Sequence, residues 1–182
     1  MDLKLATAKG PLPVIVRGDQ RLRSQARPVS PAHIPSLQPL IEDLIATAKA
    51  RDGVGIAAPQ VANGLQLFVV MSKPNRRYPH APVMPPTAMI NPTILAHSEA
   101  QSQGWEGCLS VPGLRGLVPR YRRIEVAYLD RWGQPQRHSL EGFLARIFQH
   151  EYDHLQGVLF PDRVQASTDL VTEERYWQMV GR

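Results

Sequence analysis

The chain has 182 residues, of which 43% are apolar and 20% are charged, and its net charge is +5. This length suits one well-buried core and excludes two, so we expect a single domain over residues 1–182. Without a charged leader or an apolar run of about 18 residues, a secretory signal and a spanning helix are excluded, and we expect a cytoplasmic protein with no membrane partner. The excess arginines lie mainly in a strand-rich region and indicate a solvated surface, so we expect no specific nucleic-acid partner, although this surface suits transient contact with a ribosome.

The first third of the chain predicts one strong helix. Over residues 36–51 the apolar side chains recur at helical spacing, which indicates an amphipathic helix with one buried face. A Gly-rich turn at 53–60 follows, and the β-forming apolar run at 66–71 predicts a strand. Residues 72–86 contain five prolines, so we expect a loop there.

The middle of the chain predicts further strands, at 88–95 and at 123–130. The expected strands cluster together, and the two expected helices lie on either side of them without βαβ alternation. We therefore expect an α+β fold with mostly antiparallel sheets packed around the second helix.

The second helix carries the motif QHEYDH, in which His150 and His154 are four residues apart and Glu151 follows the first. The apolar stripe of this helix is formed by Leu140, Phe143, Leu144, Ile147 and Phe148. Continuing its period places Glu151 and His154 on the same inward face, with His150 beside it. Histidines at this spacing on one face reach a common metal ion, so the motif predicts a metal site.

Two histidines leave a catalytic metal site one ligand short. A downstream glutamate, Glu173 or Glu174, would complete a zincin-type endopeptidase, whereas the metzincin pattern is excluded because Phe160 stands where its third histidine would be. The other candidate is the one cysteine, Cys108, which also rules out an internal disulfide and fits a reducing compartment. The residues alone leave Cys108 and Glu174 open.

Three motifs together resemble the peptide deformylases of bacteria and organelles. GVGIAAPQ, EGCLS and QHEYDH stand in the order that this family shows, and the likeness covers about residues 12–164. The resemblance implies that Cys108 is the third ligand and that the cofactor is Fe²⁺, with Zn²⁺, Ni²⁺ or Co²⁺ able to substitute. It also implies a hydrolase of the bacterial cytosol or an organelle, which removes the formyl group from the N-formyl-methionyl end of nascent peptides. The alternative is the zincin-type metalloendopeptidase.

The resemblance assigns roles to individual residues. Glu151 would act as the general base for attack by a metal-bound hydroxide, and the Gln60 amide and the Leu109 backbone N–H would stabilise the oxyanion. The substrate-binding residues that it implies are Gly53, Val54 and Gly55 for the peptide backbone, Phe143 and Ile147 for the methionine pocket, and Arg115 further along the peptide. Two features depart from the usual pattern: Arg146 replaces an apolar residue on the metal helix, and the tail after Arg163 is short.

Overall fold

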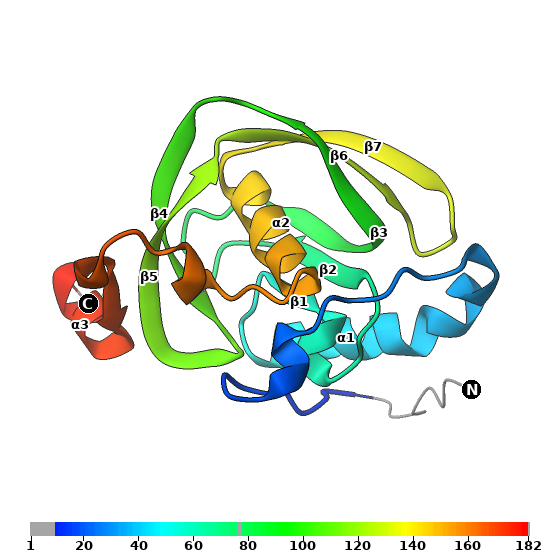
Figure 1. Ribbon diagram of the computed structural model, residues 1–182, viewed down its shortest axis with the longest axis horizontal. Helices are drawn as coiled ribbons and strands as arrows, with labels where there is room; N and C mark the ends of the chain where they lie inside the picture. The colour runs from blue at the N-terminus through cyan, green and yellow to red at the C-terminus, as the bar shows by residue number, and fades with distance from the viewer. Residues whose placement is uncertain (1–9, 76–77, 182) are drawn as a thin grey trace.

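The computed structural model describes residues 10–75 and 78–181 and contains two antiparallel sheets (Figure 1). The larger sheet has the order β1-β2-β3-β6-β7, with strands Gly55–Ala57, Leu67–Ser72, Met84–His97, Arg123–Leu129 and Pro135–Glu141. The smaller sheet has the order β4-β5-β8, with strands Gln101–Cys108, Val111–Tyr121 and Leu170–Thr172. The expected α+β fold with antiparallel sheets is confirmed.

Three α-helices accompany the sheets in the described part of the chain: α1 Gln38–Ala50, α2 Gly142–Leu155 and α3 Glu173–Met179. Short 3-10 helices cover Gln20–Arg23, Pro31–Leu37, Ala58–Val61, Phe160–Arg163 and Ser167–Asp169. Among the described residues, no helix combines the length and apolar character needed to cross a bilayer. In Figure 1, α2 runs through the middle of the molecule, and α3 lies at the edge beyond β5.

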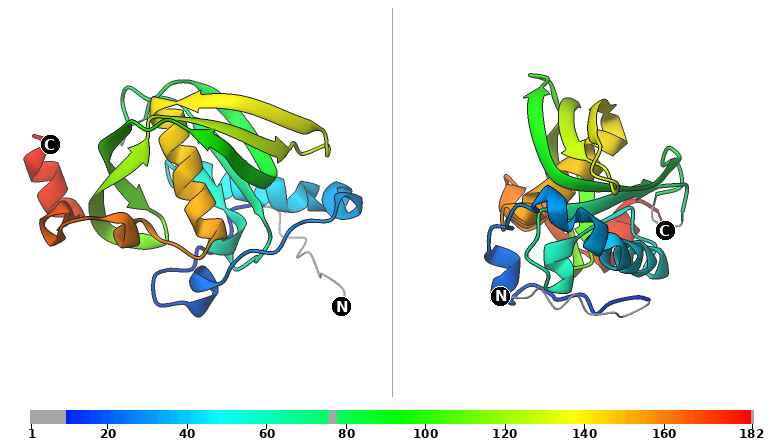
Figure 2. Two further views of the ribbon diagram at one scale, coloured as in Figure 1. Left: turned by 45° about the horizontal axis from the view of Figure 1, so that its top comes forward. Right: turned by 90° about the vertical axis from the view of Figure 1, so that its right-hand side faces the viewer.

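The buried strand β2 explains why the two long helices lie on opposite faces of the larger sheet. Its side chains point alternately to the two faces, as strand geometry requires. Leu67, Val69 and Met71 join the apolar cluster of α1, whereas Phe68 and Val70 join the apolar cluster of α2. Figure 2 shows the ribbons of the helices and of the larger sheet from two further directions. The metal helix is therefore anchored on the larger sheet by an apolar face.

The two ends of α2 are set by glycines. Gly142 opens the helix with a φ of 58°, and Gly157 follows its end with a φ of 72°. These left-handed conformations are accessible to glycine without strain. A Cβ on Gly157 would also lie 2.5 Å from the backbone oxygen of Arg23, so the segment around Arg23 packs directly on the end of the helix.

Most of the expected elements are confirmed, and their bounds differ in places. The strands expected at 66–71, 88–95 and 123–130 correspond to β2, β3 and β6. The expected helix at 36–51 is α1, preceded by a 3-10 segment, and the Gly-rich turn contains the short strand β1. Leu140 was expected on the metal helix but lies in β7, because the chain changes direction at Gly142.

The loop expected at 72–86 is partly wrong. Residues 76–77 lie outside the described part of the chain, but Ser72 ends β2 and β3 already begins at Met84. Pro85 and Pro86 therefore belong to a strand. The β2–β3 register shifts between Val70 and Ser72, so these prolines lie beside an irregularity at the first residues of the strand, where a missing N–H is tolerated.

Candidate metal centre

Cys108, His150 and His154 form a compact cluster of metal-ligating side chains. One ligand atom from each, a sulfur and two imidazole nitrogens, lies within 4.8 Å of the other two. The Cys108 Sγ is 3.2 Å from the His154 Nε2. Cys108 ends β4 of the smaller sheet, whereas both histidines lie on α2. A thiolate with two imidazoles, leaving a further position open, is a donor set that suits a catalytic transition-metal ion. The prediction that Cys108 joins the two histidines is confirmed.

The alternative ligand Glu174 is not part of this cluster. It lies on the exposed α3, on the far side of β5 from α2, whereas Cys108, at the end of β4, lies beside the two histidines. The zincin-type ligand set is therefore wrong for this chain. The segment between α2 and α3 includes β8, which pairs with β5, so α3 and Glu174 lie apart from the histidines.

The two histidines have opposite surroundings. The Nδ1 of His150 lies 2.9 Å from a Glu106 oxygen, which fixes Nδ1 as the N–H donor and leaves Nε2 for the metal. The Nδ1 of His154 is buried without a hydrogen-bond partner among the described residues. Burial lowers the pKa of His150, but hydrogen bonds to Cys108 and Glu106 outweigh burial and raise it well above the ordinary value. For His154, burial and the neighbouring His150 lower the pKa well below its usual range.

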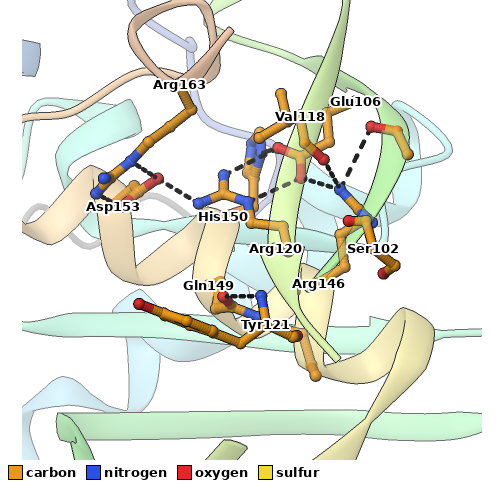
Figure 3. Close-up of polar contacts among 12 residues, drawn as sticks. Ser102, Glu106, Val118, Arg120, Tyr121, Arg146, Gln149, His150, Asp153 and Arg163 are labelled. Carbon is orange, nitrogen blue, oxygen red and sulfur yellow. Dashed lines mark hydrogen bonds and ion pairs between the residues drawn. The ribbon is translucent and has the colours of Figure 1, made fainter. Parts of the chain in front are cut away.

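Glu106 is the centre of a buried ionic network behind the metal ligands (Figure 3). One of its oxygens accepts from Arg120 at 3.0 Å and from Arg146 at 2.9 Å, and the other accepts from Arg120 at 3.0 Å and from His150. Arg120 also donates to Asp153 at 2.6 Å. Burial alone would raise the pKa of Glu106, but His150 and Arg120 hold it well below its usual range. Glu106 is therefore a carboxylate that orients His150.

Further contacts join α2 to the hairpin of β4 and β5. Arg146 donates to the carbonyls of Ser102 at 2.7 Å and Val118 at 2.8 Å, and the Gln149 amide pairs with both backbone groups of Tyr121. Figure 3 shows these side chains reaching from the helix to the two strands. Since the metal ligands come from both elements, these bonds keep Cys108 in register with the histidines.

Arg146 packs on the hairpin directly against Gly104. A Cβ on Gly104 would lie 2.7 Å from the Arg146 guanidinium carbon. Arg146 lines the substrate cavity, but its guanidinium is bound to backbone carbonyls and Glu106, so the charge that it brings to the cavity is paired.

Glu151 lines the same cavity as Cys108 and His150. Its side chain is buried, and one carboxylate oxygen has no hydrogen-bond partner among the described residues. A Cβ on Gly55 would lie 2.4 Å from its other oxygen, so the glycine in β1 makes room for the carboxylate. Burial raises its pKa from 4.5 to about 7. A carboxyl group with such a pKa exchanges protons readily near neutral pH.

Gln60 is held in a fixed orientation beside Cys108. Its Oε1 accepts from the backbone N–H of Ala57 at 2.9 Å, while its Nε2 donates to Ser110 Oγ at 3.1 Å and lies 3.4 Å from Cys108 Sγ. The amide N–H₂ group is therefore presented to the metal cluster, and the oxygen points away from it.

Most of the residues that the sequence predicts to be functional line one cavity. The predicted residues that line it are Gly53, Val54, Gly55, Gln60, Cys108, Leu109, Phe143, Ile147, His150 and Glu151. His154 lies behind them as a buried ligand. Arg115 does not line the cavity: its side chain is buried and pairs with Glu173 at 2.6 Å. Its contact with a peptide stays a prediction.

The structure adds functional residues that the sequence reasoning missed. Glu106, Arg120 and Asp153 form the ionic network, and Tyr78 and Trp105 line the cavity. Glu106 and Asp153 stood inside the quoted motifs EGCLS and QHEYDH without an assigned role. A charged residue within two positions of a candidate ligand was the available signal.

Comparison with known proteins agrees with this geometry. The sequence model of the family described as polypeptide deformylase matches residues 11–169. Peptide deformylase 2 of Nostoc sp. is 57% identical over 171 residues, which cover 94% of this chain and 96% of the relative. Peptide deformylase 2 of Ralstonia nicotianae is 50% identical over 156 residues, covering 86% of this chain and 88% of the relative.

Solved structures share the fold. The Met-Ala-Ser-bound crystal structure of a class I type b peptide deformylase from Acinetobacter baumannii matches with a TM-score of 0.84 and 45% identity, covering 86% of this chain and 100% of that one. The peptide deformylase of Thermotoga maritima matches with a TM-score of 0.76 and 38% identity, covering 86% and 99%. The chain therefore belongs to the polypeptide deformylase family and is a metal-dependent hydrolase that removes N-formyl groups.

Proposed function

We propose that the substrate is the N-formyl-methionyl end of a newly made peptide and that the resident metal is Fe²⁺. The observation that carries this proposal is the joint position of Cys108, His150 and Glu151 on one cavity, with His154 behind them. The deformylase from Acinetobacter baumannii was crystallised with Met-Ala-Ser, a peptide that begins with methionine. Such a peptide is what remains once a formyl group has been removed.

Cys108, His150 and His154 would hold the metal. When bound, the ion supplies a Lewis acid that polarises the formyl group and acidifies water. A thiolate with two imidazoles also accepts Zn²⁺, Ni²⁺ and Co²⁺, so the choice of iron rests on the family resemblance. With a thiolate ligand on iron, activity should be lost in air or peroxide, while a nickel or cobalt form persists. Metal analysis of anaerobically purified protein tests this directly, and a peroxide-stable iron form would contradict it.

Glu151 would carry the proton. It lines the cavity beside Cys108 and His150 without belonging to the ligand cluster, and burial raises its pKa to about 7. At that pKa it is suited to take a proton from the attacking water and to return one to the leaving amine. Gly55 leaves the space that the carboxylate occupies.

Gln60 and Leu109 would stabilise the negative charge that develops on the formyl oxygen. The Gln60 amide N–H₂ group is held next to Cys108, and Leu109 follows Cys108 directly at the cavity wall. Donors fixed in advance need no reorganisation during the reaction. Because its Oε1 is occupied by Ala57 N–H, Gln60 cannot flip to present an acceptor instead.

The methionine side chain would lie against the apolar wall. Phe143 and Ile147 line the cavity from α2, and Val54 and Trp105 line it from other segments. The backbone of residues 53–55 lies along the same cavity, where an extended peptide finds hydrogen-bonding groups. We propose that a single catalytic domain, residues 1–182, performs the reaction on nascent chains in a bacterial cytosol, as the bacterial relatives suggest. Contact with the ribosome stays a prediction.

The acyl group provides the experiment that tests the proposal. Formyl-Met peptides should be hydrolysed at least about a hundredfold better, in kcat/KM, than the matching acetyl-Met peptides, because the added methyl group finds no room beside the ligands. Internal cleavage of an unformylated peptide serves as the control for endopeptidase activity. Similar rates for formyl and acetyl peptides would overturn the assignment.

A further inference from the structure

Residues 170–179 lie beyond the part of the chain that the family model matches, which ends at residue 169. This segment contains β8 and α3, and we call it the C-terminal clasp. Its strand pairs with β5 through Leu114, Arg115 and Gly116, and its helix lies at the outer edge of the smaller sheet (Figure 1). The clasp thus adds a third strand to the sheet whose β4 carries Cys108.

The clasp encloses Arg115. Glu173 accepts two hydrogen bonds from the guanidinium, at 2.6 Å and 3.2 Å. The guanidinium carbon also lies 5.2 Å from the ring centre of Tyr176 and 5.5 Å from that of Trp177, within the range of cation–π attraction. Only 2% of the Arg115 side chain is exposed, against 39% for Glu173. The one carboxylate that the described residues place on Arg115 is therefore supplied by the clasp.

The enclosed Arg115 lies directly behind the cavity wall. A Cβ on Gly107 would be 2.7 Å from an Arg115 nitrogen, and Gly107 lines the cavity. Trp105, two residues earlier on β4, also lines the cavity and is 5.5 Å from the Tyr176 ring. The clasp therefore contacts the wall directly at Trp105, and through Arg115 of β5 it acts on the wall at Gly107.

These two points lie toward the mouth of the cavity. Cys108, Gln60 and Glu151 are buried at its inner end, whereas Trp105 and Gly107 are only partly buried. With a formyl group at the inner end, the residues that follow methionine must leave past this wall. A positive charge behind the wall would attract an acidic group of the peptide, and Glu173 opposes that attraction.

We infer that the clasp sets the enzyme's selectivity for the peptide residues that follow methionine, with Glu173 as a positioning residue that neutralises Arg115. This inference rests on the proposed function, since it concerns how formyl peptides bind. The chemical consequence is a wall that is electrically balanced and accepts nascent chains of any charge. Without the Glu173 carboxylate, the wall should favour peptides with a negative group near the third residue.

The test compares Glu173→Gln with Glu174→Gln. Both remove one negative charge from adjacent positions of α3, but only Glu173 contacts Arg115 among the described residues. The substrates are formyl-Met-Ala-Ser with a free C-terminal carboxylate and the same peptide as the carboxamide. We expect Glu173→Gln to lower the KM of the acid relative to the amide by about threefold, with kcat unchanged. Glu174→Gln should keep the wild-type ratio, and high salt should remove the difference.

Two further variants distinguish the effect of the Glu173 charge from the effect of the packing of Tyr176 on Trp105. Glu173→Asp keeps the charge and should keep the wild-type ratio. Tyr176→Leu weakens the contact with Trp105 without changing any charge, so it should raise KM for both tripeptides relative to formyl-Met-amide. Equal acid-to-amide ratios in Glu173→Gln and Glu174→Gln, with both variants folded, would overturn the inference. Absence of deformylation in the wild-type protein would instead overturn the proposed function.

Discussion

The two faces of α2 are built from different chemistry. Toward the five-stranded sheet the helix packs through apolar side chains, among them Ala145 and Phe148, which belong to one cluster with Phe68 and Val70. Toward the three-stranded sheet its side chains make hydrogen bonds and ion pairs, and these side chains are Arg146, Gln149, His150 and Asp153. Apolar contacts tolerate small shifts, whereas directional bonds fix a register. The ionic face is the one that brings Cys108 to the histidines.

The same contrast separates two buried carboxyl groups. Glu106, on the ionic side, is surrounded by cationic partners that hold its pKa well below the usual range despite burial. Glu151, on the opposite side, is desolvated, and burial raises its pKa to about 7. One carboxylate is thus kept charged to orient a ligand, and the other is able to exchange a proton. Environments that push two pKa values apart are typical of groups with different catalytic roles.

The largest expected effect comes from replacing Glu151, and it tests whether the two carboxyl groups have different roles. Glu151→Gln keeps the size of the side chain but cannot accept a proton, so kcat should fall by roughly two to four orders of magnitude. Metal content should stay at the wild-type level, because Glu151 is not a ligand. Cys108→Ala is the control, since it should lose most of the metal together with the activity. Metal analysis and turnover should be measured on the same samples. Full activity in Glu151→Gln would refute its role in proton transfer.

The second prediction concerns Glu106, whose replacement disrupts the ionic network between α2 and the three-stranded sheet. Glu106→Gln removes the charge that Arg120, Arg146 and His150 share. Among the described residues, the buried Arg120 then keeps only Asp153 as a carboxylate partner, and Arg146 loses the ion pair with Glu106. The free energy of unfolding should fall by about 3–5 kcal/mol, and a chelator should remove the metal faster than from the wild type. Denaturant titration and the rate of metal release measure the two effects.

The matched control is Glu125→Gln, which breaks the pair with Arg137. Both side chains of that pair are largely exposed, at 47% and 70%, so its loss should change the unfolding free energy by less than about 1 kcal/mol. If the two variants lost equal stability, the ionic face of α2 would have no special role.

The difference between the two faces also explains what could be predicted from the sequence. Local periodicity was enough for β2, β6 and the metal helix, because a repeat of two or 3.6 residues marks a buried face without knowledge of the partner. The ionic network could not be predicted from the sequence, because Glu106 and His150 are 44 residues apart and become partners only through the sheet topology. The short β8 and α3 have no strong hydrophobic periodicity. Their positions depend on distant partners, since β8 pairs with β5 and Glu173 of α3 pairs with Arg115.

The metal ligands differ in the same way: those on one helix could be predicted from local spacing, and the one on a distant strand could not. His150 and His154 followed from helical spacing, whereas Cys108 as the third ligand followed from the family resemblance and was then confirmed. The contact of Arg115 with the peptide stays a prediction. The structure pairs its buried side chain with Glu173, which lies in a tail whose position the sequence pattern did not reveal.

The third prediction concerns pH and the metal-free protein. The folded-state pKa of Glu151 is raised from 4.5 to about 7, so its proton stabilises the fold fully below about pH 4.5, and this stabilisation is lost as pH rises through 7. The unfolding free energy of the wild type, relative to Glu151→Gln, should therefore fall by about 2–3 kcal/mol between pH 4.5 and pH 8. Denaturant titrations of both metal-free proteins across this range measure the difference. A difference that does not change with pH would show that Glu151 titrates normally.

The smallest expected effect tests the apolar face. Ile124 on β6 is fully buried in the cluster that also contains Phe148, and Ile124→Val removes one methylene group from it. The free energy of unfolding should fall by about 1 kcal/mol. Because no directional bond to a metal ligand is changed, metal release to a chelator and kcat should match the wild type. The measurement is a denaturant titration together with the chelator assay used for Glu106→Gln. Faster metal release from Ile124→Val would mean that apolar packing on the five-stranded sheet also sets the register of the ligands, and the distinction between the two faces of α2 would no longer hold.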